Sequence, residues 1–429
     1  MALLIKNAHV VDPAANLDGV LDVLIDGDRI SAVGEGLVFD GAEVIDLTGK
    51  YLVPGLVDMH VHLREPGFEH KGDIESETAA AAAGGFTGVC SMPNTNPVAD
   101  NGTVITYIKA RAAEAGHCRV YPAGAMSKGL KGEIISEMGD MVARGAVAFT
   151  DDGRGIQGAG MMRRCMDYGK MFDKVFMSHC QDEDLVGEGQ VNEGVASTRL
   201  GLLGWPAEGE ELQISRDIML AELTGAKLHI QHISTARGLD MVRAAKDKGL
   251  PVTCEAAPPN MFLTEDAITG AYETCFKVNP PLRTSEDAQA IIEGVLDGSV
   301  DAIVTDHAPH ADWEKAREFE LAPFGMIGIE ASLALINTNL VKTGKMGYGK
   351  LVELMSINPR KILGIEPVSI EAGSLADITV FDADIEWTVG EDGYVSHAKN
   401  CGFAGTKVSG RATDVFVGGK QTLKNGAIC

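Results

Sequence analysis

Short segments at both ends of the chain alternate apolar and polar residues, with Gly and Asp between them. In residues 3–50 these segments are LLIKNAHVVD, GVLDVLIDGDRISAVG and AEVIDLTG. Residues 374–424 show the same pattern, from SLADITVFDAD to ATDVFVGGKQTLKNG. A period of two is typical of strands with one buried face, and the intervening turn residues favour antiparallel pairing. We therefore predict that the termini pair into one small β-sandwich module, formed by residues 1–51 and 368–429.

The middle of the chain, residues 52–367, has a different pattern. Eight apolar segments predict buried strands, at residues 52–60, 86–92, 119–125, 146–151, 174–180, 227–233, 251–256 and 300–306. Between them lie amphipathic stretches such as VITYIKARAAEAG and EDAQAIIEGVLDG, which end in glycine as helices often do. Strands that alternate with helices favour a parallel sheet. We predict an α/β fold with a metal-dependent (β/α)8 barrel of the TIM type, for which about 250 residues are commonly needed.

Composition narrows the class of partner. The 429 residues include 37 Lys and Arg against 61 Asp and Glu, a formal charge of −24. This charge would repel nucleic acids and anionic lipids, so neither is an expected partner. The chain has no apolar run of membrane-spanning length, no signal-like start and no Cys-x-x-Cys pair, and we interpret it as soluble and cytoplasmic. An anionic substrate would need positive charge gathered locally, from a metal and a few basic side chains.

Candidate metal ligands fall at the ends of five predicted strands. His60 and His62 are two residues apart in the first barrel strand, so their side chains point the same way. A His-x-His pair alone is often ordinary core or surface histidine. The further candidates at strand ends are Asp152, His179, His232 and Asp306. Because the carboxyl ends of the barrel strands meet at one face, where such barrels have their active sites, we expect these side chains to lie together.

Four imidazoles and two carboxylates suit Zn²⁺, and they suffice for two ions that share a bridging hydroxide. Zinc lowers the pKa of bound water and polarises a carbonyl group, which is what amide hydrolysis requires. The pattern therefore predicts a metal-dependent amidohydrolase. The alternative is that these residues are polar groups that merely close the mouth of the barrel.

Two other features have competing interpretations. The stretch Gly153-Arg-Gly155-Ile-Gln-Gly158 matches a dinucleotide-binding fingerprint, but it follows the fourth strand of a barrel pattern, and we expect these glycines to shape a βα loop. His307 adjoins Asp306, and neighbouring strand residues face opposite ways, so we expect a structural role for it rather than metal ligation.

Eight motifs resemble those of a known family. They are DMHVHLREPG (58–67), SMPNTNP (91–97), AFTDDG (148–153), SHCQDED (178–184), HISTARG (232–238), KVNPPLR (277–283), TDHAPH (305–310) and APFGMIG (322–328). Together they closely resemble the class I bacterial dihydroorotases of the amidohydrolase superfamily, from about residue 3 to residue 424. The combination of HVHLREPG, MPNT and NPPLR is specific, whereas His-x-His marks only the superfamily.

The resemblance implies a role for each matching residue. One or two Zn²⁺ ions are implied, with two favoured: His60, His62 and Asp306 would hold the first and His179 and His232 the second, with Asp152 bridging. Asp306 would also be the general base, taking a proton from the bridging water and returning it to the amide nitrogen. The implied substrate-binding residues are His62, Arg64, Asn94, Asn279, His310, Phe324 and Gly325. Arg64 and His310 would supply the expected local positive character.

The implied reaction is the reversible cyclisation of N-carbamoyl-L-aspartate to L-dihydroorotate in the de novo synthesis of UMP. Allantoinase and dihydropyrimidinase are alternatives on the same barrel, but Arg64 and Asn94 suit a free carboxylate and an aspartate occupies the bridging position. A catalytically silent homologue that assembles with aspartate carbamoyltransferase is a second alternative, although all six ligand positions are filled. A homodimer, and activity that depends on that partner, are also left open.

Two segments depart from the family pattern. Ala257-Pro258-Pro259-Asn260 stands where the family usually has Thr-Pro-His-His after the seventh strand, and Asn400-Cys401-Gly402-Phe403 matches only loosely. The missing histidines are not metal ligands in the family, so we expect the first departure to affect groups around the ligands rather than the reaction. The second is expected to alter the contact between the β module and the barrel.

Overall fold

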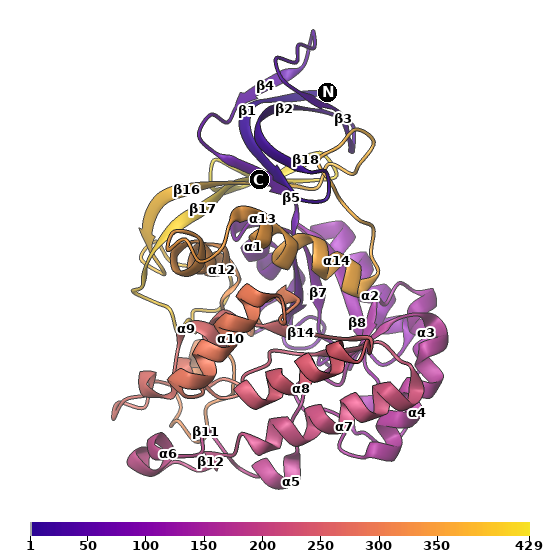
Figure 1. Cartoon of the computed structure of the whole chain (residues 1–429), viewed down its shortest axis with the longest axis vertical. Coiled ribbons are helices and arrows are strands. Elements are labelled where there is room, and N and C mark those ends of the chain that lie inside the picture. Colours follow the sequence, from indigo (N-terminus) through magenta and orange to yellow (C-terminus); the bar gives the residue numbers. More distant parts are fainter. Residues whose placement is uncertain (1) are drawn as a thin grey trace.

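A computed structural model describes residues 2–429, and its centre is a parallel barrel surrounded by helices (Figure 1). The barrel strands pair in chain order, and they are β6 (Leu56–Val61), β7 (Phe86–Ser91), β8 (Arg119–Gly124), β9 (Ala148–Phe149), β10 (Val175–Ser178), β13 (Leu228–Ile230), β14 (Val252–Ala256) and β15 (Ala302–Ile303). A bridge between Val61 and His307 brings the first strand beside the last, and His62 N donates to His307 O at 2.9 Å. The predicted (β/α)8 fold is confirmed.

The helices follow the barrel strands as the amphipathic pattern predicts. Their bounds are α1 (Ile74–Ala83), α2 (Gly102–Ala115), α3 (Met138–Ala143), α4 (Ala159–Gly169), α5 (Glu183–Val186), α6 (Val195–Leu200), α7 (Glu208–Thr224), α8 (Ala236–Asp247), α9 (Pro258–Phe262), α10 (Ser285–Asp297), α11 (Asp312–Lys315), α12 (Ile329–Ile336), α13 (Tyr348–Val352) and α14 (Asn358–Leu363). A short ribbon of β11 (Val191–Asn192) and β12 (Gly204–Trp205) lies beside α5 and α6 (Figure 1). Among the described residues, no helix has both the length and the apolar character needed to cross a membrane.

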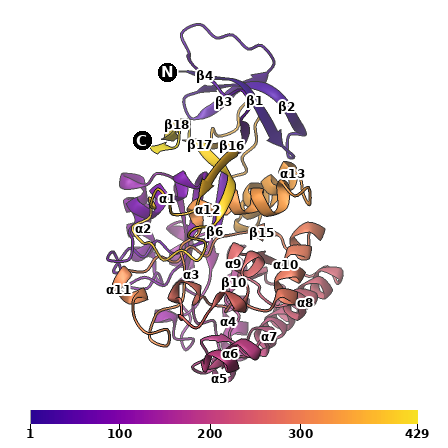
Figure 2. The ribbon, with the colours of Figure 1, turned by 90° about the vertical axis from the view of Figure 1, so that its left-hand side faces the viewer.

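The two ends of the chain form one nine-stranded sheet beside the barrel (Figure 2). Its strands are β1 (Leu3–Asp12), β2 (Leu17–Asp26), β3 (Arg29–Gly34), β4 (Glu43–Asp46), β5 (Tyr51–Pro54), β16 (Ile378–Thr388), β17 (Lys407–Val417), β18 (Lys420–Lys424) and β19 (Ala427–Ile428). The pairing of β5 with β16 joins the amino-terminal strands to the carboxyl-terminal ones. The sheet is not purely antiparallel, because β4 and β5 pair in parallel with β1. The domain limits at residues 51 and 368 stay a prediction.

The strand predicted over residues 52–60 is divided in two. Residues up to Pro54 belong to the terminal sheet, and the barrel strand starts at Leu56. Gly55 separates them in a place where a Cβ atom would lie 2.2 Å from Thr87 Oγ1. The sequence did not predict this division, because both strands are buried and their apolar residues form one run. Periodicity cannot distinguish one buried strand from two.

Candidate active site

A pocket opens at the carboxyl ends of the barrel strands. Its lining includes all of the predicted site residues except His60, namely His62, Arg64, Asn94, Asp152, His179, His232, Asn279, Asp306, His310, Phe324 and Gly325. His60 is fully buried, and its Nε2 lies within 3.5 Å of carboxylate oxygens of the pocket residues Asp152 and Asp306. The structure therefore brings together residues that are up to 265 positions apart, from His60 to Gly325.

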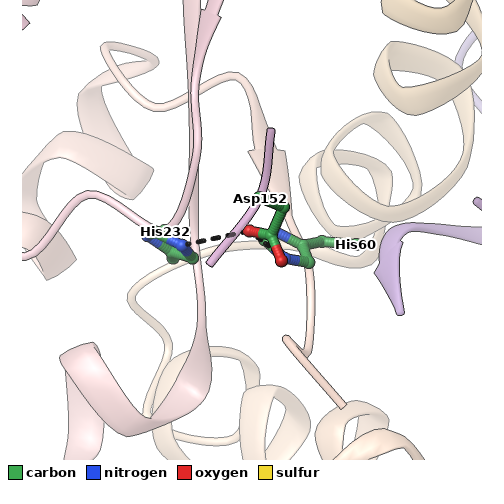
Figure 3. Close-up of side chains that lie close together, drawn as sticks. All are labelled: His60, Asp152 and His232. Carbon is green, nitrogen blue, oxygen red and sulfur yellow. Dashed lines mark ion pairs between the residues drawn. The ribbon is translucent and has the colours of Figure 1, made fainter. Parts of the chain in front are cut away.

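The imidazoles surround two carboxylates at the base of this pocket. His60 Nε2 is 3.3 Å from Asp152 Oδ1 and 3.4 Å from Asp306 Oδ1. His62 Nε2 is 3.5 Å from Asp152 Oδ2 and 3.2 Å from Asp306 Oδ1. On the other side of Asp152, Nδ1 of His179 and Nε2 of His232 lie 3.6 and 3.9 Å from its Oδ1 (Figure 3 shows His60 and His232 on either side). We call these six residues the ligand cluster.

The strand ends position the ligand cluster through unusual backbone conformations. His232 and Asp306 adopt positive φ angles of 28° and 48°, which side chains other than glycine seldom tolerate. Each lies two or three residues beyond the last residue of its strand, where the backbone turns out of the sheet. Such conformations persist only where the surroundings hold them, and they gather at functional sites.

Charges in the ligand cluster shift the pKa values of their neighbours. Burial alone would lower the pKa of His60, but the surrounding carboxylates, Asp152 foremost, raise it well above its ordinary value. Burial would raise the pKa of Asp152, but the surrounding histidines, His60 foremost, hold it well below its usual range. The pKa of Asp306 is likewise lowered despite its burial, chiefly by His60. The two carboxylates are therefore ionised and favour positive charge between them.

The ligand cluster fits a divalent metal. Two overlapping groups, His60 with Asp152 and His232, and His60 with His62 and Asp306, have ligand atoms that all lie within 4.8 Å of one another. His60 Nε2 is buried without a hydrogen-bond partner among the described residues. Two atoms that each bind Zn²⁺ tetrahedrally at about 2.1 Å stand about 3.4 Å apart. The distances from His60 Nε2 to the two carboxylates match that separation.

Three histidines of the cluster have their other ring nitrogen held by a side chain. His60 Nδ1 is 2.6 Å from Glu255 Oε1, and His62 Nδ1 is 2.9 Å from Asn94 Oδ1. His179 Nε2 is 2.9 Å from Gln181 Oε1. Because carboxylate and amide oxygens only accept hydrogen bonds, each ring nitrogen facing one carries the proton, and the opposite nitrogen is left free for a metal. Asn94 thus contacts the candidate metal ligand His62, whereas the sequence suggested only substrate binding.

The rest of the pocket, which we call the pocket wall, includes Arg64, Asn279, His310, Phe324 and Gly325. Arg64 Nε donates to Pro309 O at 3.0 Å, and burial lowers the pKa of its guanidinium only to about 10, so it stays charged. Asn279 Nδ2 donates to Gln181 Oε1 at 2.9 Å, while its Oδ1 is buried without a partner among the described residues. The wall therefore offers one cation and one free amide oxygen.

His310 differs from the expectation that it adds positive charge. Burial, helped by the nearby cations Arg64 and Lys71, lowers the pKa of His310 far below its ordinary value, so the ring is neutral. Its Nε2 donates to Phe324 O at 2.8 Å. The positive charge beside the pocket comes from Arg64, with Lys71 Nζ 3.5 Å from His310 Nδ1 as a second source that sequence reasoning missed.

Other groups that support the pocket also escaped sequence reasoning. Asn400 accepts from His310 N through Oδ1 and donates through Nδ2 to Gly325 O, each at 3.1 Å. Lys315 Nζ donates to Gly325 O at 2.9 Å. Asn260, in the segment that departs from the family, is buried beside Asn279 and Asp306 in a small cavity. Among the residues that support the site, only Glu255 could have been found from the sequence, because it is a lone carboxylate in a predicted buried strand.

The two features that had competing interpretations, the glycine-rich stretch 153–158 and His307, both have structural roles. A Cβ atom at Gly155 would lie 2.4 Å from His179 O, so this glycine lets the loop after β9 pack against the end of β10. His307 is fully buried, with Nε2 2.7 Å from Glu77 Oε2 and Nδ1 3.3 Å from Gly328 N. Both its ring nitrogens are thus occupied outside the ligand cluster.

The barrel, with histidines and aspartates at the carboxyl ends of its strands, resembles solved structures of hydantoinases. The chain superposes on L-hydantoinase (dihydropyrimidinase) from Arthrobacter aurescens with a TM-score of 0.89 and 24% sequence identity, over 100% of this chain and 97% of that one. D-hydantoinase (dihydropyrimidinase) from Thermus sp. gives a TM-score of 0.87 at 27% identity, over 100% of this chain and 96% of that one.

Sequence comparison narrows the class to one family. Residues 49–238 match the family model described as dihydro-orotase-like. The chain is 47% identical to dihydroorotase from Pelotomaculum thermopropionicum over 100% of both chains, and 48% identical to dihydroorotase from Ruminiclostridium cellulolyticum over 99% of both. The chain belongs to the dihydroorotase family of cyclic amidohydrolases, as its motifs predicted.

Proposed function

We propose that the protein catalyses the zinc-dependent, reversible cyclisation of N-carbamoyl-L-aspartate to L-dihydroorotate in pyrimidine synthesis. One observation carries this proposal: a charged, half-buried Arg64 lies in the same pocket as the ligand cluster. The ring of dihydroorotate bears a free carboxylate that is not part of the bond being broken. A site for it therefore needs a cation that is separate from the metal side, and Arg64 is such a cation.

The ligand cluster would hold one or two zinc ions, and its six residues favour two. His60, His62 and Asp306 would hold one ion, and His179 and His232 the other, with Asp152 between them. Bound Zn²⁺ would polarise the ring carbonyl and lower the pKa of water. The free nitrogens Nε2 of His60 and Nδ1 of His179 would bind metal, because their opposite nitrogens face Glu255 and Gln181.

Asp306 would move the proton. It is ionised, and its Oδ1 lies 3.2 Å from His62 Nε2 at the edge of the pocket. In hydrolysis it would take a proton from the attacking water and give it to the ring nitrogen as the bond between carbonyl carbon and nitrogen breaks. In cyclisation the same carboxyl group would take the proton from the carbamoyl nitrogen and pass it to the departing water.

The pocket wall would hold the substrate during these steps. Arg64 would bind the free carboxylate through a charge-assisted hydrogen bond. Asn279 Oδ1, which is buried without a partner in the described chain, would accept from a ring N–H. His310, neutral and fixed to Phe324 O through Nε2, would keep its Nδ1 beside Lys71, so it would border the carboxylate and leave the charged contact to Arg64. The backbone at Phe324 and Gly325 would border the ring.

A substrate panel tests the proposal. Zinc-loaded protein would be assayed with dihydroorotate, carbamoyl-aspartate, dihydrouracil and allantoin, alone and with aspartate carbamoyltransferase added. We expect turnover of the first two. Turnover of dihydrouracil or allantoin instead would favour the alternative cyclic amidohydrolases, and turnover of none in either condition would favour a silent homologue. Gel filtration of the same samples tests the proposed homodimer and the complex.

A further inference from the structure

Glu255 occupies a position below the ligand cluster that neither the motifs nor the pocket lining includes. It lies on β14 and is fully buried. Its Oε1 is 2.6 Å from His60 Nδ1 and accepts from His232 N at 3.2 Å, while its Oε2 accepts from His229 Nε2 at 3.0 Å. One carboxylate on β14 thus joins β6 to β13 and to the segment that follows β13.

A buried carboxylate costs free energy unless charge and hydrogen bonds compensate it. Glu255 has three such partners, the rings of His60 and His229 and the backbone N–H of His232. His229 is itself held from its other side, since Nδ1 is 2.7 Å from Thr253 Oγ1. The carboxylate therefore has a fixed orientation before any ligand binds.

This orientation determines what His60 presents to the pocket. The carboxylate keeps a proton on His60 Nδ1, so Nε2 stays without one when the ring is neutral. That Nε2 is the buried atom without a hydrogen-bond partner in the described chain, and it faces Asp152 and Asp306. The same Glu255 oxygen holds the backbone of His232 at its strained positive φ.

We propose that Glu255 is a positioning residue of the metal centre, which selects the Nε2 tautomer of His60 and fixes the spacing between His60 and His232. The proposal rests on the metal centre proposed above. The ring centroids of His60 and His232 are 5.1 Å apart, and the two residues come from different strands. Because Glu255 bonds to both residues, it would set the separation between them. Carboxylates behind metal-binding histidines typically contribute 10- to 100-fold in metal affinity.

A purely structural role makes a different prediction. Asp377 is also a fully buried carboxylate, bonded to Arg119 Nε at 2.7 Å and close to Arg360, but it belongs to the segment that leads into β16 of the terminal sheet. If Glu255 served only packing, Glu255→Gln and Asp377→Asn would change stability alike and leave zinc affinity unchanged. If Glu255 positions ligands, only Glu255→Gln would weaken zinc.

The test measures zinc affinity by competition with a chromophoric chelator, on full-length wild type, Glu255→Gln and Asp377→Asn, with folding checked by circular dichroism. We expect Glu255→Gln to bind zinc about 10- to 100-fold more weakly and Asp377→Asn to match wild type. Wild-type zinc affinity in folded Glu255→Gln would overturn the proposal. Because the readout is zinc binding, it succeeds or fails separately from the substrate panel.

A second measurement does not depend on the folding of Glu255→Gln. Nitrogen-15 NMR of histidine-labelled, zinc-loaded wild type, with His60 assigned by its loss in His60→Gln, reports the tautomer. We expect a proton on Nδ1 in a strong hydrogen bond, shifted downfield, and Glu255→Asp should move this signal. A proton on Nε2 of His60, or a signal that Glu255→Asp leaves in place, would overturn the proposal even if Glu255→Gln fails to fold.

Discussion

The ligand cluster and the pocket wall lie in one pocket but are held in different ways. In the cluster, side chains hold side chains: Glu255, Asn94 and Gln181 each fix the second nitrogen of a histidine at the end of a barrel strand. In the wall, the contacts run mainly to backbone carbonyls of one loop, from Arg64 to Pro309 O and from His310 to Phe324 O. The cluster is therefore set by the barrel, whereas the wall is set by the path of a loop.

This difference separates two functions that could fail independently. Loss of a cluster histidine should remove metal and, with it, all activity. A change in the wall should leave metal in place and alter the KM for substrates that carry a free carboxylate. The predictions below test that separation.

The largest effect is expected from loss of a cluster histidine. His60→Ala or His179→Ala should reduce turnover to background and remove zinc together, because each ring faces the buried Asp152 carboxylate. Metal analysis and circular dichroism of the purified variants check this. His9→Ala, in the terminal sheet, is the control and should keep both. A His60 variant with full zinc and full turnover would contradict the assignment of the cluster.

Asp306→Asn should remove the base while keeping the size of the side chain. General acid and base groups contribute about 10²–10⁴-fold, and we expect a loss of that size in both reaction directions with most zinc retained. Asp301→Asn, at the opposite end of β15, is a matched control and should be nearly unchanged in rate. A loss below about tenfold with metal in place would make Asp306 a ligand only.

The pH dependence follows from the same residue. The pKa of Asp306 lies below its ordinary value, since His60 and His62 outweigh burial. The base form is therefore present across the neutral range, and hydrolysis should lose rate only as the pH falls into the acid range. Cyclisation releases water from the protonated carboxyl group of the substrate, so it should gain rate as the pH falls. Initial rates in both directions over the same buffers check this; profiles that move together would contradict it.

Arg64→Met should raise the KM for dihydroorotate with little change in zinc. A charge-assisted hydrogen bond contributes about 1.5–3 kcal/mol, which corresponds to about ten- to a hundredfold in affinity. Steady-state kinetics and metal analysis give the two quantities. Arg243→Met, on α8 and outside the pocket, controls for the substitution itself. Unchanged binding of dihydroorotate would remove Arg64 from the proposed site.

The smallest effect is expected from Asn400, which supports the wall from the carboxyl-terminal part of the chain. Asn400→Ala removes the bonds to His310 N and Gly325 O. We expect the loss of these bonds to weaken substrate binding by about 1 kcal/mol, which corresponds to about a fivefold rise in KM. The kcat and the zinc content should be nearly unchanged. Asn425→Ala, in a turn of the terminal sheet, is the control. Loss of zinc in Asn400→Ala would show that the wall and the cluster are not separate.

The comparison also explains what could be predicted from sequence. The eight barrel strands and the strand-end positions of the cluster follow from local periodicity, because parallel strands bring their carboxyl ends to one face. Asn400 could not be found in this way, since it reaches His310 from 90 positions away through a loop. The charge of His310 could not be predicted from the sequence either, because it depends on how deeply the ring is buried.

Comparing dihydroorotate with dihydrouracil tests the central claim most directly, because the two rings differ in the free carboxylate. The measurement is the ratio of kcat/KM for the two compounds, in zinc-loaded wild type and in Arg64→Met. We expect a strong preference for dihydroorotate in wild type that falls about ten- to a hundredfold in Arg64→Met, with zinc content unchanged. A wild-type enzyme that hydrolyses dihydrouracil as well as dihydroorotate, or a ratio that Arg64→Met leaves unaltered, would contradict it.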